Sequence, residues 1–129
     1  MAQIKIYGLN SNLNMCKEAI SAAIHKSVMT ALEYPPEKKF HRFIGFESSD
    51  FIYPGDRSER YIIIEVSMFE GRSVDAKKAL IHQLYTNIGT DVGIGHQDIE
   101  ITIFETPKEN WGIRGMSADE LKLGYKVEV

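Results

Sequence analysis

The sequence has one cysteine, no long hydrophobic run and no excess of positive charge. Cys16 has no partner for an internal disulfide, and its place on the apolar side of the first expected helix indicates a buried thiol without a catalytic role. No run approaches the roughly 18 apolar residues of a membrane span, and no signal-peptide pattern is present, so we expect a cytoplasmic protein without a membrane partner. The net charge of −3 argues against nucleic acid as a partner.

The histidines are too scattered for a metal site. They lie at four separate positions, His25, His41, His82 and His96. These positions lack the His-x-x-x-His spacing and the Cys-x-x-Cys companion that zinc sites use, so we expect neither a metal nor a cofactor. A chain of 129 residues, 43% of them hydrophobic, is long enough for a single domain, 1–129, that buries about two thirds of its unfolded surface.

What the sequence does contain is an internal repeat with an offset of 60 residues. Two helical stretches stay in register at six positions: Lys17 with Lys77, Ala19 with Ala79, Ile20 with Leu80, Ile24 with Leu84, Val28 with Ile88, and Leu32 with Val92. Each half has the order strand, helix, strand. The ranges are 4–6, 13–32 and 40–46 in the first half, and 64–66, 74–92 and 99–104 in the second.

Two copies of one supersecondary unit must pack against each other, because neither copy buries its apolar face alone. We therefore expect two βαβ units, about 2–47 and 61–115, that share one sheet, followed by a tail at 116–129.

Local signals predict the boundaries of these elements. The polar residues 10–12 indicate a turn before the first helix, and the two prolines at 35–36 end that helix in a tight connection. Ser73 stands where the second helix needs an N-cap. Residues 117–120 have the Ser-x-x-Glu form of a capping box and predict a short helix. Strict alternation at 125–129 is typical of an edge strand, or of a tail that adds to a neighbouring subunit.

The middle of the chain reads as a loop that joins the two halves. Residues 48–58 are rich in polar residues and contain Pro-Gly. We expect Phe51 and Tyr53 to anchor this loop. The strand at 61–69 begins with Tyr-Ile-Ile-Ile, which is typical of a strand covered on both faces near its start.

Two runs in the second half are more specific. Residues 69–78 read Phe-Glu-Gly-Arg-Ser-Val-Asp-Ala-Lys-Lys, and residues 105–115 read Glu-Thr-Pro-Lys-Glu-Asn-Trp-Gly-Ile-Arg-Gly. In order and spacing, this strand, Gly-Arg-Ser turn, helix, strand and Trp-Gly-Ile hairpin resemble the 4-oxalocrotonate tautomerase-like unit of the tautomerase superfamily. With two units over residues 2–115, the chain is similar to the fused members of that superfamily, the group that contains malonate semialdehyde decarboxylase.

The resemblance implies an α+β fold, the tautomerase or MIF-like fold, with a four-stranded mixed sheet and two helices on one face. It also implies a homotrimer, in which three sheets pack around a three-fold axis. In this family an amino-terminal proline moves a proton along an enol or dienol, and arginines hold the carboxylate of a small substrate.

The sequence departs from the family at the catalytic position, where Ala2 replaces the proline. An Ala2 amine, once Met1 is removed, has an ordinary pKa near 8, which leaves roughly a tenth of it unprotonated at pH 7. Burial and a nearby cation such as Arg72 or Lys38 disfavour the ammonium and increase that fraction. Ala2 is therefore a candidate catalytic residue.

Arg72 matches the turn arginine that the family uses to bind a carboxylate. Its planar fork pairs with both carboxylate oxygens, whereas a cation at a helix N-terminus opposes the helix macrodipole, so capping does not explain it. We assign Arg72 to catalysis and substrate binding, with a solvated turn residue as the alternative. Trp111 aligns with an aromatic residue of the family's pocket, and packing of the hairpin explains it equally well.

Other positions distinguish this chain within the family. Lys38 and Arg42, in the run Lys-Lys-Phe-His-Arg, are candidate substrate-binding cations, although such a run is also typical of a solvated strand end. Asn12 stands in the first half where the second half has Arg72, so the two pockets implied by the repeat are not equivalent. The decarboxylases carry an acidic residue and a second arginine where this chain has Lys38 and Glu70, which disfavours decarboxylation.

Two functions follow from these observations. The first is a tautomerase or isomerase that acts on a small carboxylated enol or keto acid, with the Ala2 amine moving the proton and Arg72 holding the substrate. The second is a catalytically inactive trimer that keeps the fold and binds a metabolite or a protein, which Ala2 in place of proline favours.

Overall fold

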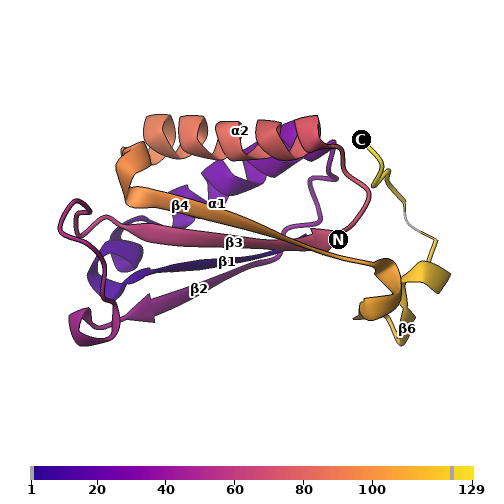
Figure 1. Cartoon of the computed structure of the whole chain (residues 1–129), viewed down its shortest axis with the longest axis horizontal. Helices are drawn as coiled ribbons and strands as arrows, with labels where there is room; N and C mark the ends of the chain where they lie inside the picture. The colour runs from indigo at the N-terminus through magenta and orange to yellow at the C-terminus, as the bar shows by residue number, and fades with distance from the viewer. Residues whose placement is uncertain (1, 123) are drawn as a thin grey trace.

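The computed structural model describes residues 2–122 and 124–129, and its centre is one four-stranded sheet with both long helices on the same face (Figure 1). The strands and long helices are β1 (Ala2–Leu9), α1 (Asn10–Leu32), β2 (His41–Phe46), β3 (Ile62–Phe69), α2 (Val74–Val92), β4 (Ile99–Thr106), β5 (Gly112–Ile113) and β6 (Met116–Ser117). The sheet order is β2-β1-β3-β4, with an antiparallel central pair and parallel outer pairs. The predicted α+β fold is confirmed.

The repeat is visible in the two central strands. β1 and β3 start 60 residues apart, have the same length and show the same alternation of buried and half-buried side chains. Because successive side chains of a strand point to opposite faces, Ile4 and Ile6 of β1 lie on the helix side, as do Ile64 and Val66 of β3.

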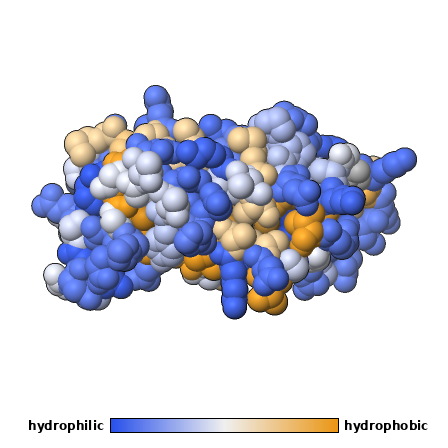
Figure 2. Space-filling view, turned by 90° about the horizontal axis from the view of Figure 1, so that it is seen from above, coloured by the Kyte–Doolittle hydropathy of each residue, from blue (hydrophilic) through white to orange (hydrophobic). Residues whose placement is uncertain are grey.

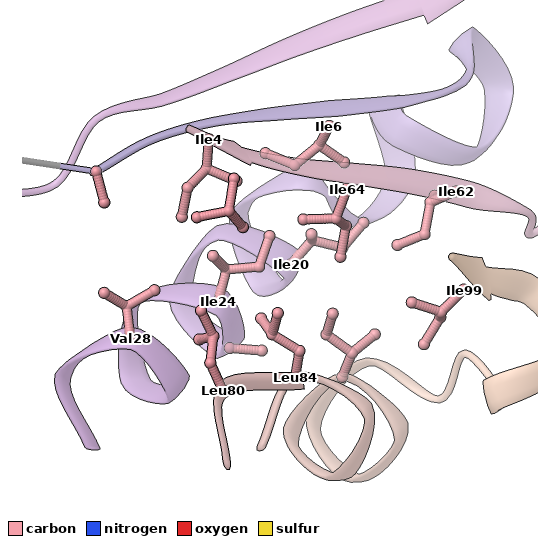
Figure 3. Close-up of a cluster of buried hydrophobic side chains, with 14 of the residues drawn as sticks. Ile4, Ile6, Ile20, Ile24, Val28, Ile62, Ile64, Leu80, Leu84 and Ile99 are labelled. Carbon is pink, nitrogen blue, oxygen red and sulfur yellow. The ribbon is translucent and has the colours of Figure 1, made fainter. Parts of the chain in front are cut away.

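The core lies between the sheet and the two helices. Figure 3 shows strand side chains meeting helix side chains, with Ile4, Ile6, Ile62, Ile64 and Ile99 opposite Ile20, Ile24, Val28, Leu80 and Leu84. Each of these side chains is at most 2% exposed. This apolar layer holds both βαβ units on one sheet, as the repeat predicts.

The two helices also share one buried polar contact. Asn87 of α2 donates a hydrogen bond from Nδ2 to Oγ of Ser27 in α1 at 2.9 Å, and the two residues lie 60 positions apart. Seen from above, the helix side of the molecule is mainly hydrophilic with interspersed hydrophobic side chains (Figure 2). In the described part of the chain, no helix is long and apolar enough to cross a membrane.

The helix boundaries confirm one prediction and correct another. α2 begins after Ser73, whose Oγ accepts the Ala76 N–H at 3.1 Å, as an N-cap does. The turn predicted at 10–12 is wrong, because α1 already begins at Asn10. The polar side chains find partners outside the helix there: Asn10 donates to Glu47 at 2.9 Å, and Asn12 is buried against Arg60.

The connection between the halves is held by aromatic stacking, as expected. The ring of Phe51 stacks on Phe46 at 5.4 Å and on Tyr61 at 5.5 Å, and Tyr53 contacts both Phe51 and Tyr61. This cluster fixes the loop against the sheet at the end where β3 begins.

In the C-terminal region the predicted short helix is present, but its predicted cap and the predicted edge strand are not. Residues 118–120 form a single 3-10 turn after Ser117, whose Oγ bonds to the Asp119 carboxylate and does not cap the turn. Residues 125–129 are irregular and form no strand in the described part of the tail. They pack on their own chain, where Val127 is 2% exposed against Phe69 and the carbonyl oxygen of Val129 accepts the Ser73 N–H at 3.0 Å.

Candidate functional site

One end of the sheet brings together distant parts of the sequence. Ala2 is the first residue of β1 and lies opposite Met68, near the end of β3. The turn that joins β3 to α2 follows Met68 along the chain, and the C-terminal tail lies beside this turn (Figure 1). In that turn Gly71 has φ +131°, a conformation that side-chain-bearing residues rarely adopt. The sharp turn directs Arg72 toward the protein interior, where it is 4% exposed.

The Arg72 guanidinium is buried with unused hydrogen-bond donors. Its Nη1 lies 3.4 Å from the carbonyl oxygen of Phe69, while Nε and Nη2 have no hydrogen-bond partner among residues 2–122 and 124–129. Burial lowers the pKa of Arg72 below its usual value. Four neighbouring groups raise this pKa and so offset part of the effect of burial: Tyr125, Tyr34, Glu105 and Glu128. A buried cation with two donor nitrogens unused is suited to a planar anion such as a carboxylate.

Ala2 is the second group at this end, and it is 3% exposed. Its peptide N–H, which follows Met1 in the sequence, donates a hydrogen bond to the Tyr34 hydroxyl oxygen at 3.0 Å. The Tyr34 ring packs edge to face on the ring of Tyr125, a residue of the C-terminal tail, with the two ring centroids 5.2 Å apart. The two hydroxyls share a hydrogen bond. Burial raises the pKa of both tyrosines, so both hydroxyls are neutral at pH 7.

The tail covers the turn that carries Arg72. A Cβ atom at Gly71 would meet Val127 Cγ1 at 3.0 Å and the Glu128 carboxylate at 3.5 Å. Tyr125 and Val127 therefore bring apolar cover to the turn, and Glu128 brings a negative charge close to the guanidinium. The tail thus contributes to the burial of Arg72.

Trp111 lies between a structural contact and an open groove. Its ring packs edge to face on Phe69 at 5.0 Å, and its carbonyl oxygen accepts the Ala118 N–H at 2.8 Å, so it anchors the hairpin. It also lines a groove of about 450 Å³ on the outer side of the sheet, together with Gln3 and Phe104. Both roles considered for Trp111 are compatible with this position.

The cations of the run 38–42 lie in the turn before β2 and in β2 itself, beside β1. Lys38 is half-buried and closes the proline turn through its N–H, which donates to Pro35 at 3.1 Å. Arg42 is exposed, and its Nη2 lies 3.5 Å from Gln3 Oε1. Burial, helped by the neighbouring Lys39 and His25, lowers the pKa of His41 to about 4, so this histidine adds no charge at pH 7.

The corresponding position in the first repeat is already satisfied. Asn12, which is equivalent to Arg72, accepts a hydrogen bond from Arg60 Nε at 2.8 Å and donates one to the Arg60 carbonyl oxygen at 3.1 Å. Arg60 Nη2 also lies 3.3 Å from the carbonyl oxygen of Val92. The two ends of the sheet are therefore not equivalent, as the sequence predicts.

The sequence predicted Ala2 and Arg72 as site residues, and both lie at this end of the sheet with Tyr34 as a common neighbour. It did not predict Tyr34 or Tyr125. The only local signal for Tyr34 was its position before the proline turn, and nothing in the sequence links it to Tyr125 in the tail. In the ranges 2–122 and 124–129, no group of three or more histidine, cysteine, aspartate or glutamate side chains is placed to hold a metal ion.

Comparison with known proteins gives a consistent result. Residues 38–114, more than half of the chain, match the family described as "Tautomerase enzyme". The 2-hydroxymuconate tautomerase of Comamonas testosteroni is 42% identical over 57 residues, which is 44% of this chain and 90% of that protein. The probable tautomerase YusQ of Bacillus subtilis is 22% identical over 116 residues, 86% of this chain and 91% of that protein.

Solved structures share the fold at low sequence identity. A native fused 4-OT superposes with a TM-score of 0.80 at 19% identity, covering 92% of this chain and 98% of that one. The FG41 malonate semialdehyde decarboxylase inhibited by 3-bromopropiolate superposes with a TM-score of 0.81 at 23% identity, covering 94% of this chain and 98% of that one. Another similar structure is described as a symmetric trimer of fused 4-OT.

Proposed function

Because the chain belongs to the tautomerase family, we propose that it is a tautomerase that moves a proton on a small carboxylated enol or keto acid. The observation that carries the proposal is Arg72, a guanidinium that is 4% exposed and has Nε and Nη2 without partners in the part of the chain that the structure describes. Burying such a group is costly unless an anion completes it. A substrate carboxylate supplies two oxygens in the matching geometry.

The Ala2 nitrogen is the proposed base. Once Met1 is removed, this nitrogen becomes a primary amine at a residue that is 3% exposed in the chain with Met1, and its partner Tyr34 is also a neighbour of Arg72. Burial and a nearby cation both favour the neutral form that accepts a proton. The amine takes a proton from the substrate and returns it at a second atom of the conjugated system, so the reaction needs no further reactant. General acid–base catalysis of this kind contributes about 10² to 10⁴ in rate.

The experiment is the ketonisation of an aryl enolpyruvate by the full chain with Ala2 at its terminus, as checked by intact mass. We expect a rate above that of buffer, and we expect Arg72→Ala to reduce kcat/KM by at least 100-fold. Arg57→Ala is the matched control. Arg57 lies in the loop before β3 and forms a salt bridge with Glu100, at the end of the sheet opposite Arg72. Equal losses in both arginine variants would contradict a specific role for Arg72.

We also propose that the protein is a homotrimer in which the outer faces of three sheets meet. The outer face of β3 carries Ile63, which is only half-buried in the single chain, and a similar fused 4-OT structure is described as a trimer. A monomer in light scattering at micromolar protein would reject this assembly.

The alternative function is a catalytically inactive binding protein with the same fold. Ala2 in the position of the family's proline favours it. In that case the enol is bound by Arg72 but is not ketonised faster than in buffer. Equilibrium binding that Arg72→Ala abolishes, without any catalysed rate, would support this second function.

A further inference from the structure

We propose that Tyr34 is a positioning residue for the Ala2 nitrogen, and that Tyr125 of the C-terminal tail holds Tyr34 in place. The inference rests on the proposed function, because it assigns a role at the same site. Tyr34 is 4% exposed, and its hydroxyl oxygen accepts a hydrogen bond from the peptide N–H of Ala2 at 3.0 Å across 32 residues of sequence. Removal of Met1 turns this same nitrogen into the amine that faces Tyr34.

Replacing proline by alanine creates a specific problem that Tyr34 solves. The nitrogen of an amino-terminal proline is fixed in its ring, so its lone pair has one direction relative to the backbone. A primary amine rotates about its Cα–N bond and samples three staggered positions. When one N–H is donated to the Tyr34 oxygen, this rotation stops and the lone pair keeps one direction, which is the condition for efficient proton transfer.

Tyr34 is itself held from two sides. Its backbone precedes Pro35, which restricts the conformation of the residue before it. Its ring packs edge to face on Tyr125 at 5.2 Å, and the Tyr125 hydroxyl shares a hydrogen bond with the Tyr34 hydroxyl. Tyr125 belongs to the tail segment whose Val127 is buried against Phe69. The folded tail therefore contributes to the position of the base.

The hydrogen bond also affects the basicity of the amine. An ammonium donates a stronger hydrogen bond to the tyrosine oxygen than a neutral amine does. Removing that oxygen therefore disfavours the ammonium, and the amine titrates at lower pH. A purely structural tyrosine does not produce this change.

The test compares Tyr34→Phe and Tyr125→Phe in the full chain with Ala2 at its terminus. Tyr85→Phe is the matched control, because it removes the hydroxyl that donates to Ile99 at 2.9 Å, where β4 begins. In Tyr34→Phe we expect kcat for the enol to fall about 10-fold and KM to stay within about twofold, because Arg72 still binds the carboxylate. We expect a smaller fall in Tyr125→Phe and none in Tyr85→Phe.

A second measurement does not depend on catalysis. The pH dependence of acylation of the Ala2 amine gives its titration midpoint, which we expect to move down by about one pH unit in Tyr34→Phe. An unchanged midpoint in a folded Tyr34→Phe protein overturns the role of Tyr34, as does an unchanged kcat in an active enzyme. If the native protein has no ketonisation activity, the proposed function fails, and the midpoint alone decides whether Tyr34 positions the amine.

Discussion

Replacing Arg72 by methionine is expected to stabilise the protein by about 1 to 2 kcal/mol while it abolishes binding of a carboxylate. The guanidinium is 4% exposed, and two of its nitrogens have no partner in residues 2–122 and 124–129. Methionine keeps much of the apolar side chain and removes the cost of desolvating a charge. The lost hydrogen bond to Phe69 is long, at 3.4 Å, and offsets only part of that gain.

The free energy of unfolding in urea tests this expectation, at one fixed protein concentration because assembly affects apparent stability. Arg42→Met is the matched control, since Arg42 is exposed and we expect its change to stay within about 0.5 kcal/mol. A loss of more than about 1 kcal/mol in Arg72→Met would show that the arginine is a structural residue. Higher stability without binding would instead show that the protein keeps a destabilising charge for its function.

The second large effect is expected in the core. Ile64→Ala should destabilise the protein by about 3 to 4 kcal/mol, because it removes three buried carbons and leaves a cavity that rigid neighbours fill only in part. Ile64 is 0% exposed and lies among the side chains of both helices and of the neighbouring strands (Figure 3). Urea unfolding measures the loss directly.

Two other isoleucines make this measurement specific. Ile52→Ala is the same chemical change at a side chain that is 92% exposed, and we expect less than about 0.5 kcal/mol from it. Ile63→Ala changes the outer face of the same strand. If the outer faces of three sheets meet, Ile63→Ala weakens assembly, whereas Ile64→Ala lowers stability without changing the number of subunits. Equal losses for Ile64 and Ile52 would contradict the described core.

Much of the fold could be predicted because its signals are periodic and local. The 60-residue offset of the helix positions predicted two equivalent units, and β1 and β3 keep that offset. Ser73 marked the start of α2, because an N-cap depends only on the next few residues. The predicted turn at 10–12 and the strand at 125–129 failed, because partners far along the chain, Glu47 and Phe69, decided those conformations.

The candidate site divides in the same way. The sequence by itself determined the family, the repeat, the replacement of proline by Ala2 and the presence of Arg72 in its turn, because each of these is a residue at a fixed place in a local motif. Only the tertiary structure decided that Arg72 is buried with unused donors, that Arg60 satisfies the equivalent Asn12, and that Tyr34 and Tyr125 meet at the Ala2 nitrogen. Those are properties of contacts between distant segments, and packing sets them without leaving a periodic trace in the sequence.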